Sequence, residues 1–104
     1  MKSEALDQYL NLIREFKSGA IDGPKFAKQY MQMFKEDETE YSDKVFLTLD
    51  KLFAEVDGYE PDPVLLAELR KKGPPGFYLD EAELRELAAI ALKTIWSEID
   101  RSSS

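Results

Sequence analysis

Apolar residues recur at intervals of three and four along most of this chain, which is the spacing of one face of an α-helix. The first stripe consists of Leu6, Tyr9, Leu10, Ile13 and Phe16. It predicts a helix that Ser3 can cap and that reaches about Ser18, because Gly19 follows as a stop signal. The chain is therefore expected to begin with an amphipathic helix.

A second stripe consists of Phe26, Ala27, Tyr30, Met33 and Phe34. It predicts a helix that Asp22 or Gly23 caps and that accommodates Pro24 in its first turn. The helix is expected to fade within the acidic residues 36–40, because like charges at close spacing disfavour its continuation.

A third stripe consists of Val45, Leu49, Leu52, Phe53 and Val56. It predicts a helix opened by Ser42 or Asp43. On the other side of this helix, Asp43, Asp50 and Asp57 recur every seven residues. The third helix is therefore expected to carry an acidic stripe opposite its apolar one.

Two further segments complete the chain. Residues 64–70 can form a short helix, and the Gly-Pro-Pro-Gly run at 73–76 then breaks the chain. The last helix is expected to start at Asp80, with Glu83 completing a capping box, and to reach about Ser97. Its stripe consists of Leu84, Leu87, Ala88, Ala91, Leu92, Ile95 and Trp96.

No strand-like alternation and no internal repeat interrupts this pattern. Four amphipathic helices with short links predict an all-α fold, an antiparallel four-helix bundle with a short extra helix between the third and fourth. We expect one domain over residues 1–104, with a frayed tail at 102–104. Its core is expected to contain Leu10, Ile13, Phe34, Leu49, Phe53, Leu87, Leu92 and Ile95.

The composition says little more about the fold, but it excludes several classes of function. The chain is 43% hydrophobic and 34% charged, as in an ordinary globular domain, and it has no cysteine and no histidine. The usual general base and the commonest metal ligands are therefore absent, and we expect no cofactor and no metal. No apolar run approaches the ~20 residues of a membrane span, and the first residues lack a secretory signal's apolar core. We expect a cytoplasmic protein that does not contact membranes.

The negative charge is concentrated in one part of the chain. The net charge is −7, yet residues 36–62 carry ten acids and two bases, while the remaining residues sum to +1. Direct binding of nucleic acid is disfavoured, because it requires a basic footprint. A basic partner is favoured, because a field of one sign steers association.

The stretch that closes the third helix, residues 57–62, is called the elbow here. It carries Asp57, Glu60 and Asp62, and a proline follows each of the last two. Because proline restricts both its own backbone and that of the preceding residue, Glu60 and Asp62 are expected to be extended and the elbow to be stiff. We interpret its acids as a partner contact.

Catalytic and metal-binding interpretations fit these residues less well. The acids fall on predicted loops and an exposed helix face, where carboxyl pKa values stay ordinary, and no nucleophile–base pair appears, so we expect no enzyme. A calcium loop would need the order Asp-x-Asp-x-Asp-Gly, which the elbow lacks. A carboxylate-bridged metal site in the bundle core would call for Glu-x-x-His.

Two loop tyrosines and the acidic run leave alternatives open. Tyr59 and Tyr78 either contact a partner, as exposed tyrosines often do, or form a lid over the open end of the bundle. The acidic residues 36–40 are most simply a solvated linker.

The elbow and the residues before it also resemble a known family. The elements Leu52-Phe53, Val56-Asp57 and Tyr59-Glu60-Pro61-Asp62 resemble the motif of the colicin D immunity proteins, within the wider group of colicin-like bacterial self-protection proteins. The likeness is specific over residues 52–62. It extends loosely over residues 5–96, through the order of the helices and the capped, leucine-rich last helix.

This resemblance implies a small helical bundle that binds the nuclease domain of a bacteriocin or contact-delivered toxin. In colicin D that nuclease cuts transfer RNA in the anticodon loop, and the acids of the immunity protein occupy its basic RNA site. By position in the motif, Asp57, Glu60 and Asp62 would be those acids, with Tyr59 between them.

We therefore expect a monomeric immunity protein that binds the basic nuclease domain of a cognate toxin. The expected contact is centred on the elbow and flanked by Asp50 and Glu55. The alternative is an acidic helical adaptor or regulatory module with no toxin partner.

Overall fold

The computed structural model describes residues 4–73 and 76–102, which form five helices. These are α1 (Glu4–Ser18), α2 (Gly23–Glu36), α3 (Asp43–Asp57), α4 (Pro63–Lys72) and α5 (Glu81–Ser102). Within these residues the only β-type pairing is an isolated parallel bridge between Tyr59 and Leu79. The predicted all-α fold is confirmed.

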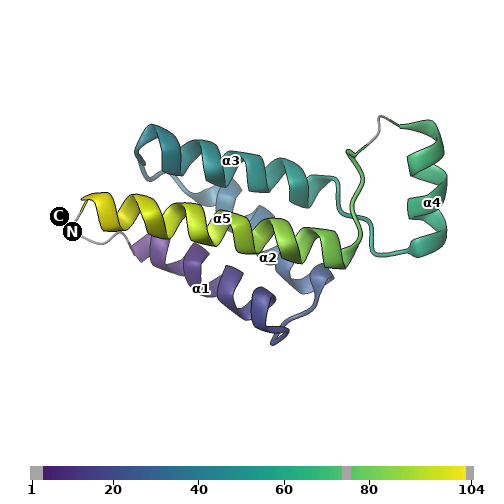
Figure 1. Cartoon of the computed structure of the whole chain (residues 1–104), viewed down its shortest axis with the longest axis horizontal. Coiled ribbons are helices and arrows are strands. Elements are labelled where there is room, and N and C mark those ends of the chain that lie inside the picture. Colours follow the sequence, from purple (N-terminus) through teal and green to yellow (C-terminus); the bar gives the residue numbers. More distant parts are fainter. Residues whose placement is uncertain (1–3, 74–75, 103–104) are drawn as a thin grey trace.

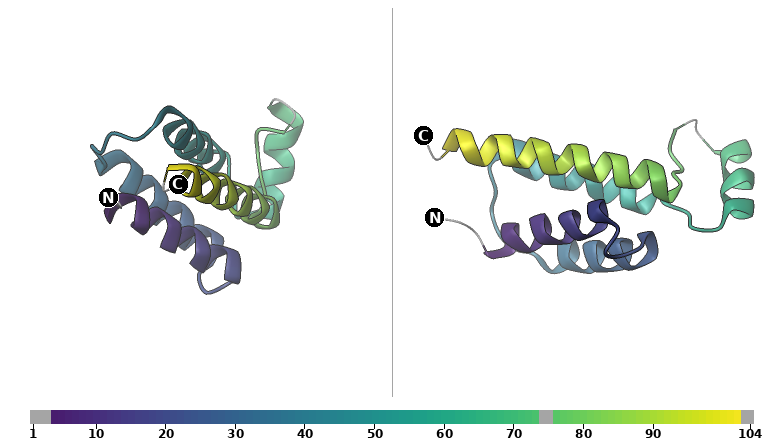
Figure 2. Two further views of the ribbon diagram at one scale, coloured as in Figure 1. Left: turned by 60° about the vertical axis from the view of Figure 1, so that its left-hand side comes forward. Right: turned by 60° about the horizontal axis from the view of Figure 1, so that its bottom comes forward.

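Four of the helices form an antiparallel bundle (Figure 1). Helices α1, α2, α3 and α5 run alternately in opposite directions and pack in the cyclic order α1, α2, α3, α5, with a smaller contact between α2 and α5 across the bundle. Helix α4 stands apart beyond one end of the bundle, as both views of Figure 2 also show. The end of α1, the start of α2, the end of α3 and the start of α5 therefore all meet at the end nearest α4.

Local signals place the helix starts where the sequence predicts them. Asp22 caps α2 by accepting a hydrogen bond from Lys25 N at 3.0 Å, and Ser42 caps α3. Asp80 and Glu83 form the predicted capping box, in which each side chain accepts the other residue's backbone N–H, at 2.8 and 3.0 Å. The proposed cap Ser3 lies outside the described residues.

The helix ends depart from expectation in two places. Helix α4 extends from Pro63 to Lys72, beyond the expected range 64–70. Helix α5 continues to Ser102, past the expected end near Ser97, so Ser102 belongs to a helix and not to a frayed tail. Partly buried residues near this end, Trp96 and Ile99, pack against the core, which supplies a reason for the helix to continue. Residues 103–104, also expected to fray, lie outside the described part.

Aromatic side chains from α1 and α2 form much of the bundle core. The rings of Phe16 and Phe26 are stacked with centroids 4.2 Å apart, and those of Tyr9 and Tyr30 are tilted at 5.5 Å. All four are fully buried. The Tyr30 hydroxyl donates to the backbone oxygen of Leu49 at 2.7 Å, so this buried polar atom is satisfied and links α2 to α3.

The expected core is confirmed for five of its eight members. Leu10, Ile13, Leu49, Leu92 and Ile95 are buried. Phe34, Phe53 and Leu87 are only partly buried and pack against the outside of the core. Phe34 and Phe53 stack on each other at 4.7 Å, so they cover the seam between α2 and α3. On α3 the fully buried side chains are Leu49 and Leu52, and Leu52 was not among the expected core residues.

A carboxylate fixes the loop between α2 and α3. Asp37 accepts hydrogen bonds from the hydroxyls of Tyr9 at 3.0 Å and Tyr41 at 2.5 Å, and from Thr39 N at 2.9 Å. Partial burial works to raise the pKa of this carboxyl, but the hydrogen bonds outweigh it and hold the pKa below its usual value. This acid of the 36–40 run therefore stabilises the fold, whereas Glu36, Glu38 and Glu40 are exposed.

Phe53 was expected in the core and Leu52 was not, but their burial predicts that truncating Leu52 destabilises the protein more. Leu52→Ala should lower the free energy of unfolding by about 2–5 kcal/mol, because it opens a cavity in closed packing. Phe53→Ala should cost less, because its site is partly open and can be filled by water or by movement of Phe34. Urea denaturation of both variants checks this, and a larger loss for Phe53→Ala would contradict it.

Candidate partner-binding surface

The backbone of the elbow is pinned to the segment that leads into α5. Leu79 N donates to Gly58 O at 2.9 Å, and Glu60 N donates to Leu79 O at 3.0 Å. A Cβ added to Gly58 would lie 2.3 Å from the Phe77 carbonyl oxygen, so this close approach requires glycine. The elbow is therefore held by hydrogen bonds as well as by the restriction that its prolines impose.

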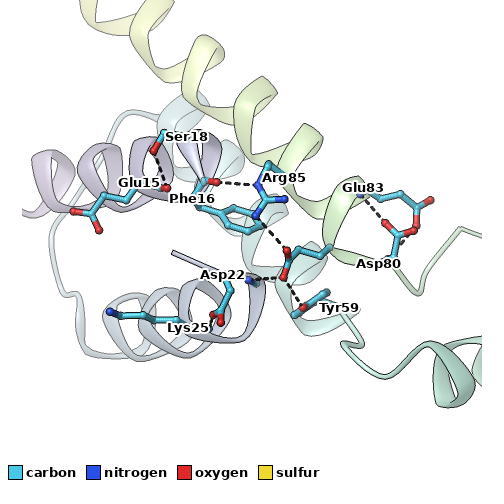
Figure 3. A network of polar contacts seen from close by, with 11 residues as sticks. Glu15, Phe16, Ser18, Asp22, Lys25, Tyr59, Asp80, Glu83 and Arg85 are labelled. Carbon is cyan, nitrogen blue, oxygen red and sulfur yellow. Dashed lines mark hydrogen bonds and ion pairs between the residues drawn. The ribbon is translucent and has the colours of Figure 1, made fainter. Parts of the chain in front are cut away.

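Tyr59 points from the elbow into the bundle (Figure 3). Its hydroxyl donates to Glu81 Oε1 at 3.3 Å, and the side chain packs partly buried against the core. Burial, with the nearby Glu81 carboxylate, raises the pKa of Tyr59 to about 12. A Cβ on Gly23 would lie 2.3 Å from the Tyr59 hydroxyl, so the start of α2 is packed closely on this ring. This placement favours the lid interpretation for most of the side chain.

Glu81 joins the four chain segments that meet at this end of the bundle. Its Oε1 also accepts the Gly23 N–H at 2.7 Å, and its Oε2 pairs with Arg85 at 3.3 Å. Arg85 in turn donates from Nε to Phe16 O at 2.9 Å and lies over the Phe16 ring at 4.6 Å. This junction was not predicted from the sequence. Its only signal was the i, i+4 spacing of two opposite charges, which is common on exposed helix faces.

The acids of the elbow face outward, and two of them also hold the backbone. Asp57 is the exposed last residue of α3. Glu60 is half-buried, and its Oε2 accepts the Asp62 N–H at 3.0 Å. Asp62 is exposed and caps α4, with its Oδ1 accepting from Val64 N at 2.9 Å and Leu65 N at 3.5 Å. The structure therefore brings these three acids together on one short, fixed segment.

The two flanking acids lie on different sides of α3. Asp50 is exposed seven residues before Asp57, so it shares the acidic side of the helix. Glu55 instead lines a shallow groove between α3 and α5, together with Lys51 and Leu87. Partial burial raises the pKa of Glu55, and Lys51 opposes this shift. Asp50 therefore extends the acidic surface, whereas Glu55 belongs to a separate one.

Helix α4 begins directly after the elbow and presents apolar side chains to solvent. Val64 is 71% exposed and Leu65 is 42% exposed, whereas Leu66 is buried. The exposure of Val64 and Leu65 was not predicted from the sequence. A signal was available, because three consecutive apolar residues cannot all face the buried side of one short helix.

The other end of α4 is fastened to the segment that leads into α5. Arg70 pairs with Glu83 and donates to Tyr78 O. A Cβ on Gly73 would lie 2.4 Å from the Tyr78 ring, so that ring packs closely on the end of α4. Tyr78, like Tyr59, is therefore engaged within the protein.

Residues 4–73 and 76–102 contain no group of three or more acidic side chains placed to hold a metal ion. Over the same ranges, no helix combines the length and apolar character needed to cross a membrane. The surface formed by the elbow and the first turn of α4 presents exposed carboxylates beside exposed apolar side chains.

Comparison with known proteins gives one match. The family model described as bacterial self-protective colicin-like immunity matches residues 5–95 of this chain. No curated protein and no solved structure matches. The resemblance inferred from the elbow is confirmed at the level of this family.

The capping role of Asp62 predicts that its charge and its structural contribution can be separated. Asp62→Asn should leave α4 stable, because asparagine is an equally good helix cap. Asp62→Ala should cost about 0.5–2 kcal/mol locally, because two backbone N–H groups lose their acceptor. Amide hydrogen exchange across 63–72 measures this, and equal protection in both variants would contradict it.

The raised pKa of Tyr59 predicts how its contribution depends on pH. Near neutral pH, Tyr59→Phe should lower the free energy of unfolding by about 1 kcal/mol, because it removes the hydrogen bond to Glu81. Between pH 10 and pH 12 the unfolded state loses the phenol proton while the folded state keeps it, so the parent loses stability as the pH rises. Phenylalanine has no proton to lose.

The gap in stability between parent and variant should therefore narrow across that window. Urea denaturation of both proteins near neutral pH and at the two ends of the window measures it. The remaining tyrosines and all lysines are common to both proteins and cancel in the comparison. A gap that stays constant or widens would contradict the assignment.

Proposed function

We propose, since this chain belongs to the family of bacterial self-protective colicin-like immunity proteins, that it inhibits the nuclease domain of a cognate toxin. Membership of this family supports a bacteriocin immunity role, and its members are typically inhibitors without enzymatic activity. The elbow acids enter the basic site where the nuclease holds RNA, which for the colicin D type is transfer RNA. The inhibitor binds as a monomer in the cytoplasm, where that RNA lies.

The observation that carries this proposal is the rigid presentation of Asp57, Glu60 and Asp62. Two hydrogen bonds to Leu79 fix the elbow backbone, and the Asp62 carboxylate is itself held by α4. Acids that are already ordered lose little conformational entropy when a partner binds. Carboxylates held at fixed positions on the elbow can pair with the lysines and arginines that otherwise hold RNA phosphates.

The distribution of charge supports a basic partner. The stretch 36–62, which contains α3 and the elbow, sums to −8, and the rest of the chain sums to +1. Such a field accelerates the encounter with a cationic domain and repels nucleic acid. The same acids that steer the approach then lie at the contact, with Asp50 as an extension of the surface along α3.

The remaining predicted contact residues take different roles in this proposal. Tyr59 positions the elbow through Glu81 and offers the partner only the part of its ring left exposed. Glu55 faces the groove toward α5 and contributes to the overall field more than to direct pairing. Inhibition follows from occupancy of the nuclease site, so it requires no bond-making step by this chain.

The proposal predicts that binding depends on where charge is removed and not only on how much. Asp57→Lys combined with Asp62→Asn changes the net charge by +3 and retains the cap of α4. The matched control, Glu38→Lys with Glu40→Gln, makes the same change at exposed positions in the acidic loop. The elbow variant should lose at least about 2–5 kcal/mol of binding free energy, because a lysine then faces basic residues of the partner.

Binding kinetics with the inactivated toxin domain encoded beside this chain's gene provide the measurement. The control should slow association modestly and leave dissociation unchanged, and association of the parent should slow as salt rises. Cells that carry the active toxin should lose protection with the elbow variant alone. Equal loss in both variants would assign the effect to net charge. Failure of the parent to bind any adjacent toxin domain would favour an acidic adaptor.

A further inference from the structure

Two exposed apolar side chains lie immediately beside the elbow acids. Val64 and Leu65 occupy the first turn of α4, and their backbone N–H groups both donate to the carboxylate of Asp62. The acid and the apolar pair are therefore held in one arrangement by the same hydrogen bonds. Val64 is the most exposed of the large apolar residues in the described part of the chain.

The four-helix core does not explain why these side chains are where they are. Among the described residues, α4 makes no close backbone contact with another helix, and its one buried residue, Leu66, lies outside the main core cluster. The helix is nevertheless held at both ends, because it follows the elbow, whose backbone is hydrogen-bonded to Leu79, and because Arg70 pairs with Glu83 near its end. A helix that is rigidly mounted away from the core is suited to contact another molecule.

We infer that Val64 and Leu65 form the apolar centre of the surface that binds the toxin's basic domain, with the elbow acids as its charged margin. This inference rests on the proposed function and adds a second contact to it. The partner should offer a shallow apolar patch next to its cationic site, so that the first turn of α4 fits there while the elbow reaches the basic residues.

The energetics of interfaces favour such a division. Charged pairs that lose water on binding often gain little over the cost of desolvation, although they speed association and fix orientation. Affinity is concentrated instead in a few well-packed side chains that exclude water. The elbow supplies charge and a fixed direction, but its aromatic residue, Tyr59, is turned toward the bundle. Val64 and Leu65 are exposed side chains beside the elbow acids that can supply apolar contact.

The charges along α4 indicate which of its turns meets the partner. The first turn follows Glu60 and Asp62, whereas the last turn carries Arg70, Lys71 and Lys72. A basic domain is attracted to the first turn and repelled by the last. The contact should therefore be centred on the start of α4 and leave its end in solvent.

The test compares two double variants, each of which replaces one leucine and one β-branched residue by alanine. Val64→Ala with Leu65→Ala removes the proposed contact, and alanine preserves the helix. The control, Leu47→Ala with Ile90→Ala, truncates one leucine and one β-branched residue in the groove between α3 and α5, where they are 63% and 56% exposed. Both variants are compared with the parent by circular dichroism and by kinetics on the inactivated toxin domain encoded beside this chain's gene.

We expect the α4 variant to bind at least about 30-fold more weakly through faster dissociation, with association and its salt dependence unchanged. The control should bind as the parent does. Parent-like binding by the α4 variant, or an equal loss in the control, would overturn the inference and leave the elbow contact standing. If the parent itself does not bind the domain, the proposed function fails and this inference fails with it.

Discussion

The arrangement of the chain segments at this end of the bundle depends on the contacts of the Glu81 carboxylate. It accepts hydrogen bonds from the start of α2 and from Tyr59, and it pairs with Arg85, which in turn reaches the last turn of α1. Segments that are far apart in the sequence are thereby fixed around one side chain. The relation of the elbow to the bundle follows from this arrangement, because Tyr59 is the side chain that connects the two.

Different groups of the elbow attach it to the bundle and face solvent. Its aromatic side chain and its backbone hydrogen bonds face inward, toward Glu81 and Leu79, whereas its acids face solvent. Asp62 serves both purposes, because the carboxylate that would meet a partner also caps α4. A surface of this kind can carry a high local charge without weakening the core, since its charged groups face solvent and no buried side-chain polar atom in the described part of the chain lacks a hydrogen-bond partner.

Helix α4 shows how an element outside the core can still be well defined. Its position depends on short-range fastenings, namely the cap at Asp62, the pairing of Arg70 with Glu83 and the Tyr78 ring packed on Gly73. Because Glu83 also belongs to the capping box of α5, the orientation of α4 is linked to the start of that helix. These contacts connect both the acidic elbow and the exposed apolar turn of α4 to the bundle.

The sequence by itself determined the helices, their caps and the family motif, because these depend on residues within a few positions of one another. Asp22, Ser42 and the Asp80–Glu83 pair act locally, so their patterns could be interpreted without a fold. Only the tertiary structure decided that Tyr59 faces inward, that Glu55 lines the groove toward α5, and that Phe53 covers a seam. Each of these depends on the rotation of one helix against another and on partners such as Glu81, 22 residues from Tyr59, which local spacing does not specify.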